Sequence, residues 1–330
     1  MSRLLKSFFY KVSKDITFRI TLIVGVGVAV FMTLLFFVIG LFMDEQMEMT
    51  TLTGQSMLVG SFSPVQSFGF AIPINIAVFI VLEFTQGTIR NKIIAGYSKF
   101  KIYASLFISG LVLAFALLLT YVATCTLFGA IFGGFDLSVT TMAGMSGIGT
   151  GVITAEYIIK YVILALFSYC TIVAFSVFIA TLCRNVGPCI PLILITIFGI
   201  YYLTMLFGVA VSTVNSIMDA NQNALVELKE AVAQETNPIA IAAYEEQIAE
   251  VEKTIAGTQS TYDTVNIIAS ILKCVDPQYG LAYTDFIREG NKSFTVMDNL
   301  TFFGGIGGNL AFTAAFFFGG ACLFKKRDIK

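Results

Sequence analysis

Six long apolar runs are the feature that most constrains this chain. Each extends for about 18 residues or more, which is the length of helix needed to cross the hydrocarbon core of a bilayer. Only 12% of the 330 residues are charged and the mean hydropathy is +0.85, whereas soluble domains carry about 25% charged residues. The sequence therefore predicts an all-α polytopic membrane protein with six transmembrane helices, at about Ile20–Met43, Val65–Leu82, Ile102–Phe132, Tyr157–Leu182, Val186–Val211 and Leu300–Phe324.

Positive charge is unevenly distributed between the segments that join these runs. If the N-terminus is inside, the short cytoplasmic segments hold 14 of the 20 Lys and Arg residues. Segment 44–64 has three acids and no base, and segment 212–299 has 13 Asp and Glu against five Lys and Arg. Because cytoplasmic loops are enriched in Lys and Arg, this bias predicts an N-in/C-in orientation. We therefore expect four parts. Residues 1–19 form an N-terminal interfacial segment, and residues 20–211 form the first five spans with a cytoplasmic loop at 83–101. Residues 212–299 form an outer acidic segment, and residues 300–330 form the sixth span and a basic cytoplasmic tail.

Residues 1–19 are basic and amphipathic. Five Lys and Arg residues alternate with apolar ones at helical spacing, namely Leu5, Phe8, Phe9, Val12 and Ile16. This pattern predicts an amphipathic interfacial helix in the headgroup region of an anionic leaflet. A signal peptide is the competing interpretation, but the next apolar run is too long for one and lacks a small-x-small cleavage site, which favours retention.

The acidic segment 212–299 contains a predicted extracellular helical hairpin between the fifth and sixth spans. Thr236, Asn237 and Pro238 break the helical pattern, and apolar residues on both sides follow the 3,4 spacing of a coiled-coil seam: Leu225, Leu228, Val232, Ile241, Tyr244, Ile248, Val251 and Ile255. Two interpretations stay open. The hairpin docks a partner or gates a substrate, or it only buries its own seam.

Several classes of chemistry lack their usual residues. The chain has no His, the commonest general base, and no Gly-Lys dipeptide, hence no Walker A loop for ATP. Its six cysteines include no C-x-x-C pair, and most lie in apolar runs, which favours a packing role. The spans lack the central ionisable residues with which secondary transporters bind a coupling ion. We therefore expect a non-enzyme with no metal, cofactor or nucleic-acid partner of its own, which would need a separate motor for transport.

The polar interruption 83–101 can form a short helix. Thr88 is a predicted N-cap, Gly96 suits the left-handed C′ position, and Ser98 can cap the next helix. We expect Ile89, Ile93 and Ile94 on one side, with Arg90 and Lys92 pointing elsewhere.

Glu83, at the inner edge of the second span, has two interpretations. It could be a latch that pairs with a base such as Arg90, Lys92 or one on the N-terminal helix. Alternatively it is a solvated interfacial acid, for which an exposed ion pair contributes only about 0–1 kcal/mol.

The order of residues in this loop resembles the first inner loop of ABC-2 type permeases. The likeness rests on Glu83, on Gly87-Thr88-Ile89-Arg90-Asn91-Lys92 and on Gly96-Tyr97-Ser98-Lys99. The basic ending Phe324-Lys325-Lys326-Arg327-Asp328-Ile329-Lys330, the six spans and the N-terminal helix also resemble this family.

The resemblance implies the permease subunit of an ATP-binding cassette exporter in a bacterial cell membrane. It would pair with a second permease, either an identical copy or a homologue, and with two cytosolic ATPase subunits that hold the ATP and Mg²⁺. The helix Thr88–Ala95 would be the ATPase-coupling helix, through Thr88, Ile89, Arg90, Asn91, Lys92, Ile93 and Gly96. The connection Cys183–Pro188 is very short, so most coupling would fall on this loop and the N-terminal helix.

The uncharged spans suit an amphipathic cargo such as a peptide, an antibiotic or a lipid. The alternative function is a non-transporting membrane sensor or scaffold that acts through its extracellular hairpin.

Overall fold

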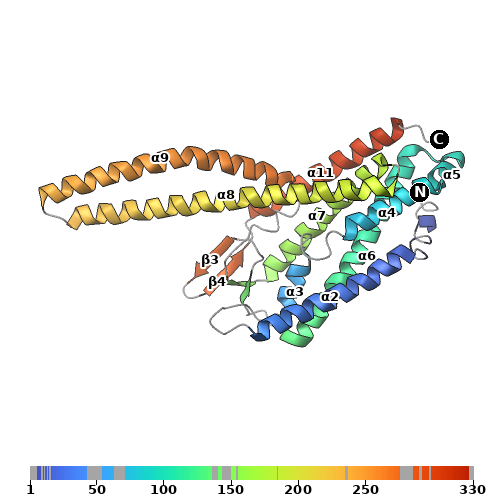
Figure 1. The fold of residues 1–330 in the computed structure, drawn as a ribbon, viewed down its shortest axis with the longest axis horizontal. Helices are drawn as coiled ribbons and strands as arrows, with labels where there is room; N and C mark the ends of the chain where they lie inside the picture. Colours follow the sequence, from blue (N-terminus) through green and yellow to red (C-terminus); the bar gives the residue numbers. More distant parts are fainter. Residues whose placement is uncertain are drawn as a thin grey trace. The chain divides into compact units, whose positions relative to one another are not determined.

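The computed structural model describes residues 6–8, 10, 12, 14, 16–42, 54–62, 71–135, 140–142, 150–153, 155–183, 185–234, 237–275, 285–289, 292–296 and 299–326. The chain is mainly helical there, with the elements α2 (Ile16–Phe42), α3 (Gly54–Ser61), α4 (Ala71–Thr85), α5 (Thr88–Ile94), α6 (Lys99–Gly133), β1 (Thr140–Met142), β2 (Thr150–Ile153), α7 (Ala155–Leu182), α8 (Val186–Gln234), α9 (Pro238–Val275), β3 (Asp285–Glu289), β4 (Lys292–Val296) and α11 (Asn299–Lys326) (Figure 1). They divide into two compact units, residues 1–198 with 274–330, and residues 199–273.

Four helices, α2, α6, α7 and α11, are long and apolar enough to cross a membrane. Helices α4 and α5 are bent by 58° relative to each other and pass the same test only when they are counted together, as a broken span or a re-entrant loop. The apolar start of α8, Val186–Gly199, is shorter. The predicted mainly helical fold, with several apolar helices long enough to cross a membrane, is thus confirmed in the described ranges, whereas the count of six spans and the orientation stay predictions.

The helix boundaries agree best with the predicted spans where the apolar runs end in polar residues. Helices α2, α6, α7 and α11 match the expected first, third, fourth and sixth spans to within a few residues. Of the second span, residues 65–70 lie outside the described residues. Helix α8 does not end near Val211 as expected but continues to Gln234. No Gly or Pro occurs between Val209 and Gln234, so falling hydropathy alone does not end the helix.

The core of the first unit lies around α4, α6 and α7. In the most apolar stretches of α6 and α7, 61% of residues are buried, against 17% in α2 and α11. Fully buried side chains include Ile76 and Ile80 of α4, Leu117 of α6 and Val173 of α7. The exposed apolar faces of α2 and α11 suit a bilayer, because lipid tails are as apolar as these side chains.

A small sheet departs from the all-α expectation. Its strand order is β1-β2-β4-β3, in which β1–β2 and β3–β4 are antiparallel and β2–β4 is parallel. The strands carry the β-branched and aromatic residues that favour extended structure, such as Val152, Ile153, Phe294 and Thr295. Strand β2 directly precedes α7 and β4 precedes α11, so their parallel pairing starts these two helices side by side.

The second unit consists of the later part of α8 and most of α9, which run side by side (Figure 1). The expected break is confirmed, because α8 ends at Gln234 and α9 begins at Pro238. The Asn237 side chain accepts a hydrogen bond from the Ile239 backbone N–H at 3.1 Å and so caps α9. All eight expected seam residues, from Leu225 to Ile255, are half-buried, as in a helix pair that packs along its own seam.

Candidate functional site

Two glycines delimit the short helix α5. Gly87 is its N-cap, with a left-handed φ of 69°, and its N–H donates to the Phe84 carbonyl at 3.1 Å, so one residue closes α4 and opens α5. The expected N-cap Thr88 was therefore wrong: it is the first helical residue, and no side chain caps this end. The positive φ at the α4–α5 turn favours glycine over threonine, which carries a Cβ.

The other end of α5 follows the prediction. Gly96 is left-handed, with φ 84°. Its N–H donates to the Ile93 carbonyl at 2.9 Å, and the Tyr97 N–H donates to the Lys92 carbonyl at 3.2 Å, which is the Schellman pattern. The Ser98 side chain accepts a bond from the Lys101 N–H and caps α6. These two caps fix the direction in which the chain leaves α5.

Two residues of α5, Lys92 and Ile94, lie on the opposite side of the helix from the one expected. Ile89 is buried, and Lys92 and Ile93 beside it are half-buried. Ile94, expected with the other isoleucines, is instead 74% exposed. Helical spacing explains this result, because position 94 follows 90 by one turn whereas positions 92 and 93 follow 89. The outward face therefore consists of Arg90, Asn91 and Ile94.

Glu83 pairs with Lys92 across the α4–α5 turn. The Lys92 Nζ donates to Glu83 Oε2 at 2.7 Å, and the side chains are only 11% and 1% exposed, respectively. Of the bases considered for Glu83, Lys92 makes this contact. Removing one partner of a buried ion pair typically destabilises the folded protein by about 3–5 kcal/mol, because the remaining buried charge is left uncompensated. The geometry thus matches a latch and contradicts a solvated acid.

The N-terminal segment enters the same cluster. Lys92 Nζ lies 3.6 Å from the centre of the Phe8 ring, a cation–π contact, and the Phe8 and Phe79 rings are 5.9 Å apart. Phe8 is only 1% exposed. The apolar side of the predicted interfacial helix is therefore anchored at Phe8 in protein rather than in lipid. Its residues Lys6, Tyr10 and Lys14 are exposed.

The end of α11 is held at the start of α6. Lys99 Nζ donates to the Lys325 carbonyl at 3.1 Å, and a lysine suits the negative end of a helix dipole. Phe324 packs against the rings of Phe84 and Tyr103. A Cβ at Gly320 would collide with the Tyr103 hydroxyl, so glycine is required for this approach. The α4–α5–α6 elbow (residues 83–101) therefore contacts the N-terminal segment and the last helix.

An uncharged polar cluster, which sequence reasoning missed, joins α7 to α11. The Thr171 hydroxyl lies 3.0 Å from the Asn309 side-chain oxygen and 3.0 Å from the Thr313 hydroxyl. Polar residues at positions 309 and 313 of an apolar helix, one turn apart, were a signal that could have revealed it. At the start of both helices, Lys160 contacts Glu156 at 2.7 Å and Asn299 at 2.9 Å. These contacts fix the register of α11 on α7.

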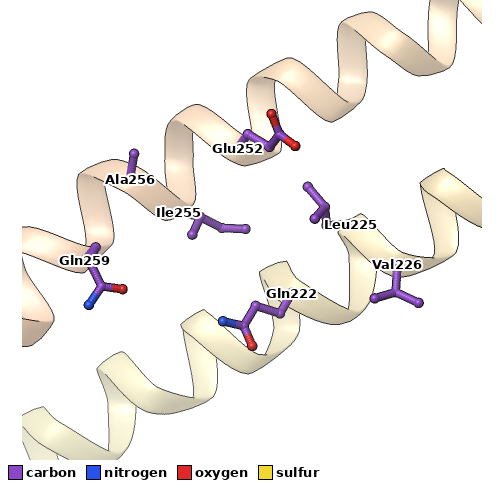
Figure 2. A pocket seen from close by; sticks show the side chains of 7 residues that line it. All are labelled: Gln222, Leu225, Val226, Glu252, Ile255, Ala256 and Gln259. Carbon is purple, nitrogen blue, oxygen red and sulfur yellow. The ribbon is translucent and has the colours of Figure 1, made fainter.

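The second unit offers little chemistry in its described residues. A shallow furrow between α8 and α9 is lined by four apolar side chains and three polar ones, namely Leu225, Val226, Ile255, Ala256, Gln222, Glu252 and Gln259 (Figure 2). Lys229 and Glu252 join the helices at 3.1 Å, with both side chains 54% exposed. In the ranges that the structure describes, no three His, Cys, Asp or Glu side chains form a group that could hold a metal ion.

Comparisons of the chain with protein-family models, with curated proteins and with solved structures found no match.

Proposed function

We propose that this chain is the permease subunit of an ATP-binding cassette exporter in a bacterial cell membrane. In this proposal it has six spans, with both termini in the cytoplasm and the α8–α9 pair outside. It works with a second permease copy or homologue and with two cytosolic ATPase subunits, and it exports an amphipathic substrate such as a peptide, an antibiotic or a lipid.

The observation that carries the proposal is the construction of the elbow. Helix α5 is fixed by two left-handed glycines and a buried ion pair, yet it presents Arg90, Asn91 and Ile94 outward. A short helix with one apolar and one basic residue on its free face suits docking into a groove of a partner. Because its other face is bound to α4 and to Phe8, force applied to α5 would reach the apolar helices.

The structure also changes the best test of this assignment. Lys92 points inward to Glu83, so changing it would disturb the elbow as well as any docking face. We expect Arg90→Glu with Ile94→Asp to weaken co-purification of the ATPase and to lower ATP-driven export at least tenfold, while insertion and thermal stability stay normal. The matched control is Lys101→Glu, an exposed base on α6. Full export by the Arg90/Ile94 double variant would refute the docking face.

The sensor or scaffold alternative is favoured by one observation, the compactness of residues 199–273 as a unit of their own. It predicts that deletion of residues 221–256 abolishes function, whereas loss of the ATPase does not. The permease proposal predicts instead that loss of the ATPase abolishes function.

A further inference from the structure

The seam between α8 and α9 is not fully closed. Among the described side chains of residues 199–273, only Met218 is buried. At the furrow, Leu225 and Ile255 extend into the space between the two helices but are only half-buried, and Val226 is 54% exposed (Figure 2). A two-helix seam normally buries such residues by knobs-into-holes packing. The furrow therefore leaves apolar surface that a third helix could cover.

The charge beside this furrow is negative. Residues 199–273 contain nine Asp and Glu residues against three Lys and no Arg. Glu252 lines the furrow, and Glu245 and Asp263 lie on the same side of α9, because they come two turns before it and three turns after it. All three carboxylates are exposed. Lys229 contacts Glu252, but this pair is 54% exposed at both ends and therefore weak. A cation of a ligand can thus compete for the carboxylate.

Charge also distinguishes between the two simplest occupants of the furrow. A second copy of the α8–α9 pair would bring a second set of nine acids, and like charges facing each other across an interface repel. An amphipathic helix with Lys or Arg on its polar side would bring apolar side chains at i, i+3, i+4 and i+7 for the furrow. Its cations would meet the row of carboxylates on α9. The observed charge therefore favours the basic helix.

We propose that the α8–α9 furrow binds a cationic amphipathic peptide as a helix. The apolar side of the peptide lies on residues 222–226 and 252–259, and its Lys or Arg side chains pair with Glu245, Glu252 and Asp263. In the proposed orientation the furrow faces the outside, so the ligand is an extracellular peptide. The site goes beyond the permease proposal and does not rest on it, because it involves the second unit alone.

The test measures peptide binding by the full-length protein in phosphatidylcholine nanodiscs. The probe is a fluorescent synthetic peptide of about 18 residues, or five helical turns, with Leu and Lys at amphipathic spacing. Fluorescence anisotropy should show saturable binding above that of empty nanodiscs. A peptide of the same composition in scrambled order, which has no apolar side, should bind at least about tenfold more weakly. Equal affinity for the two peptides, or no binding above empty nanodiscs, would overturn the proposal.

Two double variants of α9 test the position of the site. Glu245→Lys with Asp263→Lys reverses two charges of the row and should weaken binding at least about tenfold. The matched control, Glu246→Lys with Glu250→Lys, makes the same change in net charge at exposed positions about 100° or more around α9 from the row. It should alter the affinity less than about threefold. Equal losses in the two double variants would mean that the peptide only senses net charge.

A neutral variant tests the apolar floor of the furrow. Ala256→Gln adds bulk there without charge, at an exposed position, and should weaken binding of the amphipathic peptide while the thermal unfolding of the protein stays unchanged. Wild-type affinity in this variant would refute the furrow as the contact. If the same variant instead dissociated an oligomer of the wild-type protein in the absence of peptide, a second copy would be the occupant and the proposal would be wrong.

Discussion

Among the described residues, each of the two units contains a lysine–glutamate pair between two helices, and the two pairs differ chiefly in burial. Lys92 and Glu83 in the elbow meet at 2.7 Å with 11% and 1% of their side chains exposed. Lys229 and Glu252 in the α8–α9 pair meet at 3.1 Å with 54% of each exposed. Water competes for the second pair but hardly reaches the first. The same type of ion pair therefore fixes the local conformation where it is buried, and contributes little to stability where it is exposed.

The largest expected effect tests the buried pair. Glu83→Ala leaves Lys92 buried without this carboxylate, and we expect the free energy of unfolding to fall by about 3–5 kcal/mol. Thermal unfolding of the purified protein in detergent measures it, with Glu252→Ala as the matched control in the exposed pair. Glu83→Gln combined with Lys92→Met removes both charges and should recover most of the loss. If Glu83→Ala and Glu252→Ala unfold at the same temperature, the contrast between the pairs is wrong.

The next effect separates the ring contact from the charge contact. Phe8→Leu keeps an apolar side chain in the cluster but removes the ring under Lys92, which should cost about 1–2 kcal/mol. A double-mutant cycle with Lys92→Met isolates this interaction, because the two losses should not add. Tyr10→Leu, at a position 69% exposed, is the control. Purely additive losses would mean that Phe8 contributes only its apolar area.

Helix caps provide a comparison of intermediate size. Asn237 caps α9 and Ser98 caps α6, and replacing either by Ala should cost about 1 kcal/mol. Since Asn237 and Ile239 at the start of α9 are exposed, the Asn237→Ala loss should appear as faster amide exchange in the first turn of α9. In Ser98→Ala, the Schellman bonds of Gly96 still hold the preceding turn, so exchange in α5 should stay slow. Fast exchange throughout α5 would show that the elbow depends on this one hydroxyl.

What the sequence could predict here was local. The caps at Gly96 and Ser98 and the break before Pro238 follow from residue types within a few positions of each other. The sequence left Arg90, Lys92 and the N-terminal bases open as partners of Glu83, because the choice depends on which face of α5 packs against α4. The small sheet depends on pairing residues near 152 with residues near 294, and the Thr171 cluster depends on α7 meeting α11. The ATPase-docking role of α5 stays a prediction.

The smallest expected effect concerns the exposed pair. Lys229→Ala removes the cross-helix contact with Glu252, yet both groups are half in water, so we expect a loss of at most about 1 kcal/mol. The α8–α9 pair is rich in acids, and salt screens both the lost attraction and the repulsion among the remaining carboxylates. The difference between Lys229→Ala and wild type should therefore shrink further at high ionic strength, whereas that of Glu83→Ala should not. Melting curves at low and high salt for both variants measure this directly. A loss for Lys229→Ala that is large and independent of salt would mean that the α8–α9 pair is shielded by a partner, which is what the scaffold alternative requires.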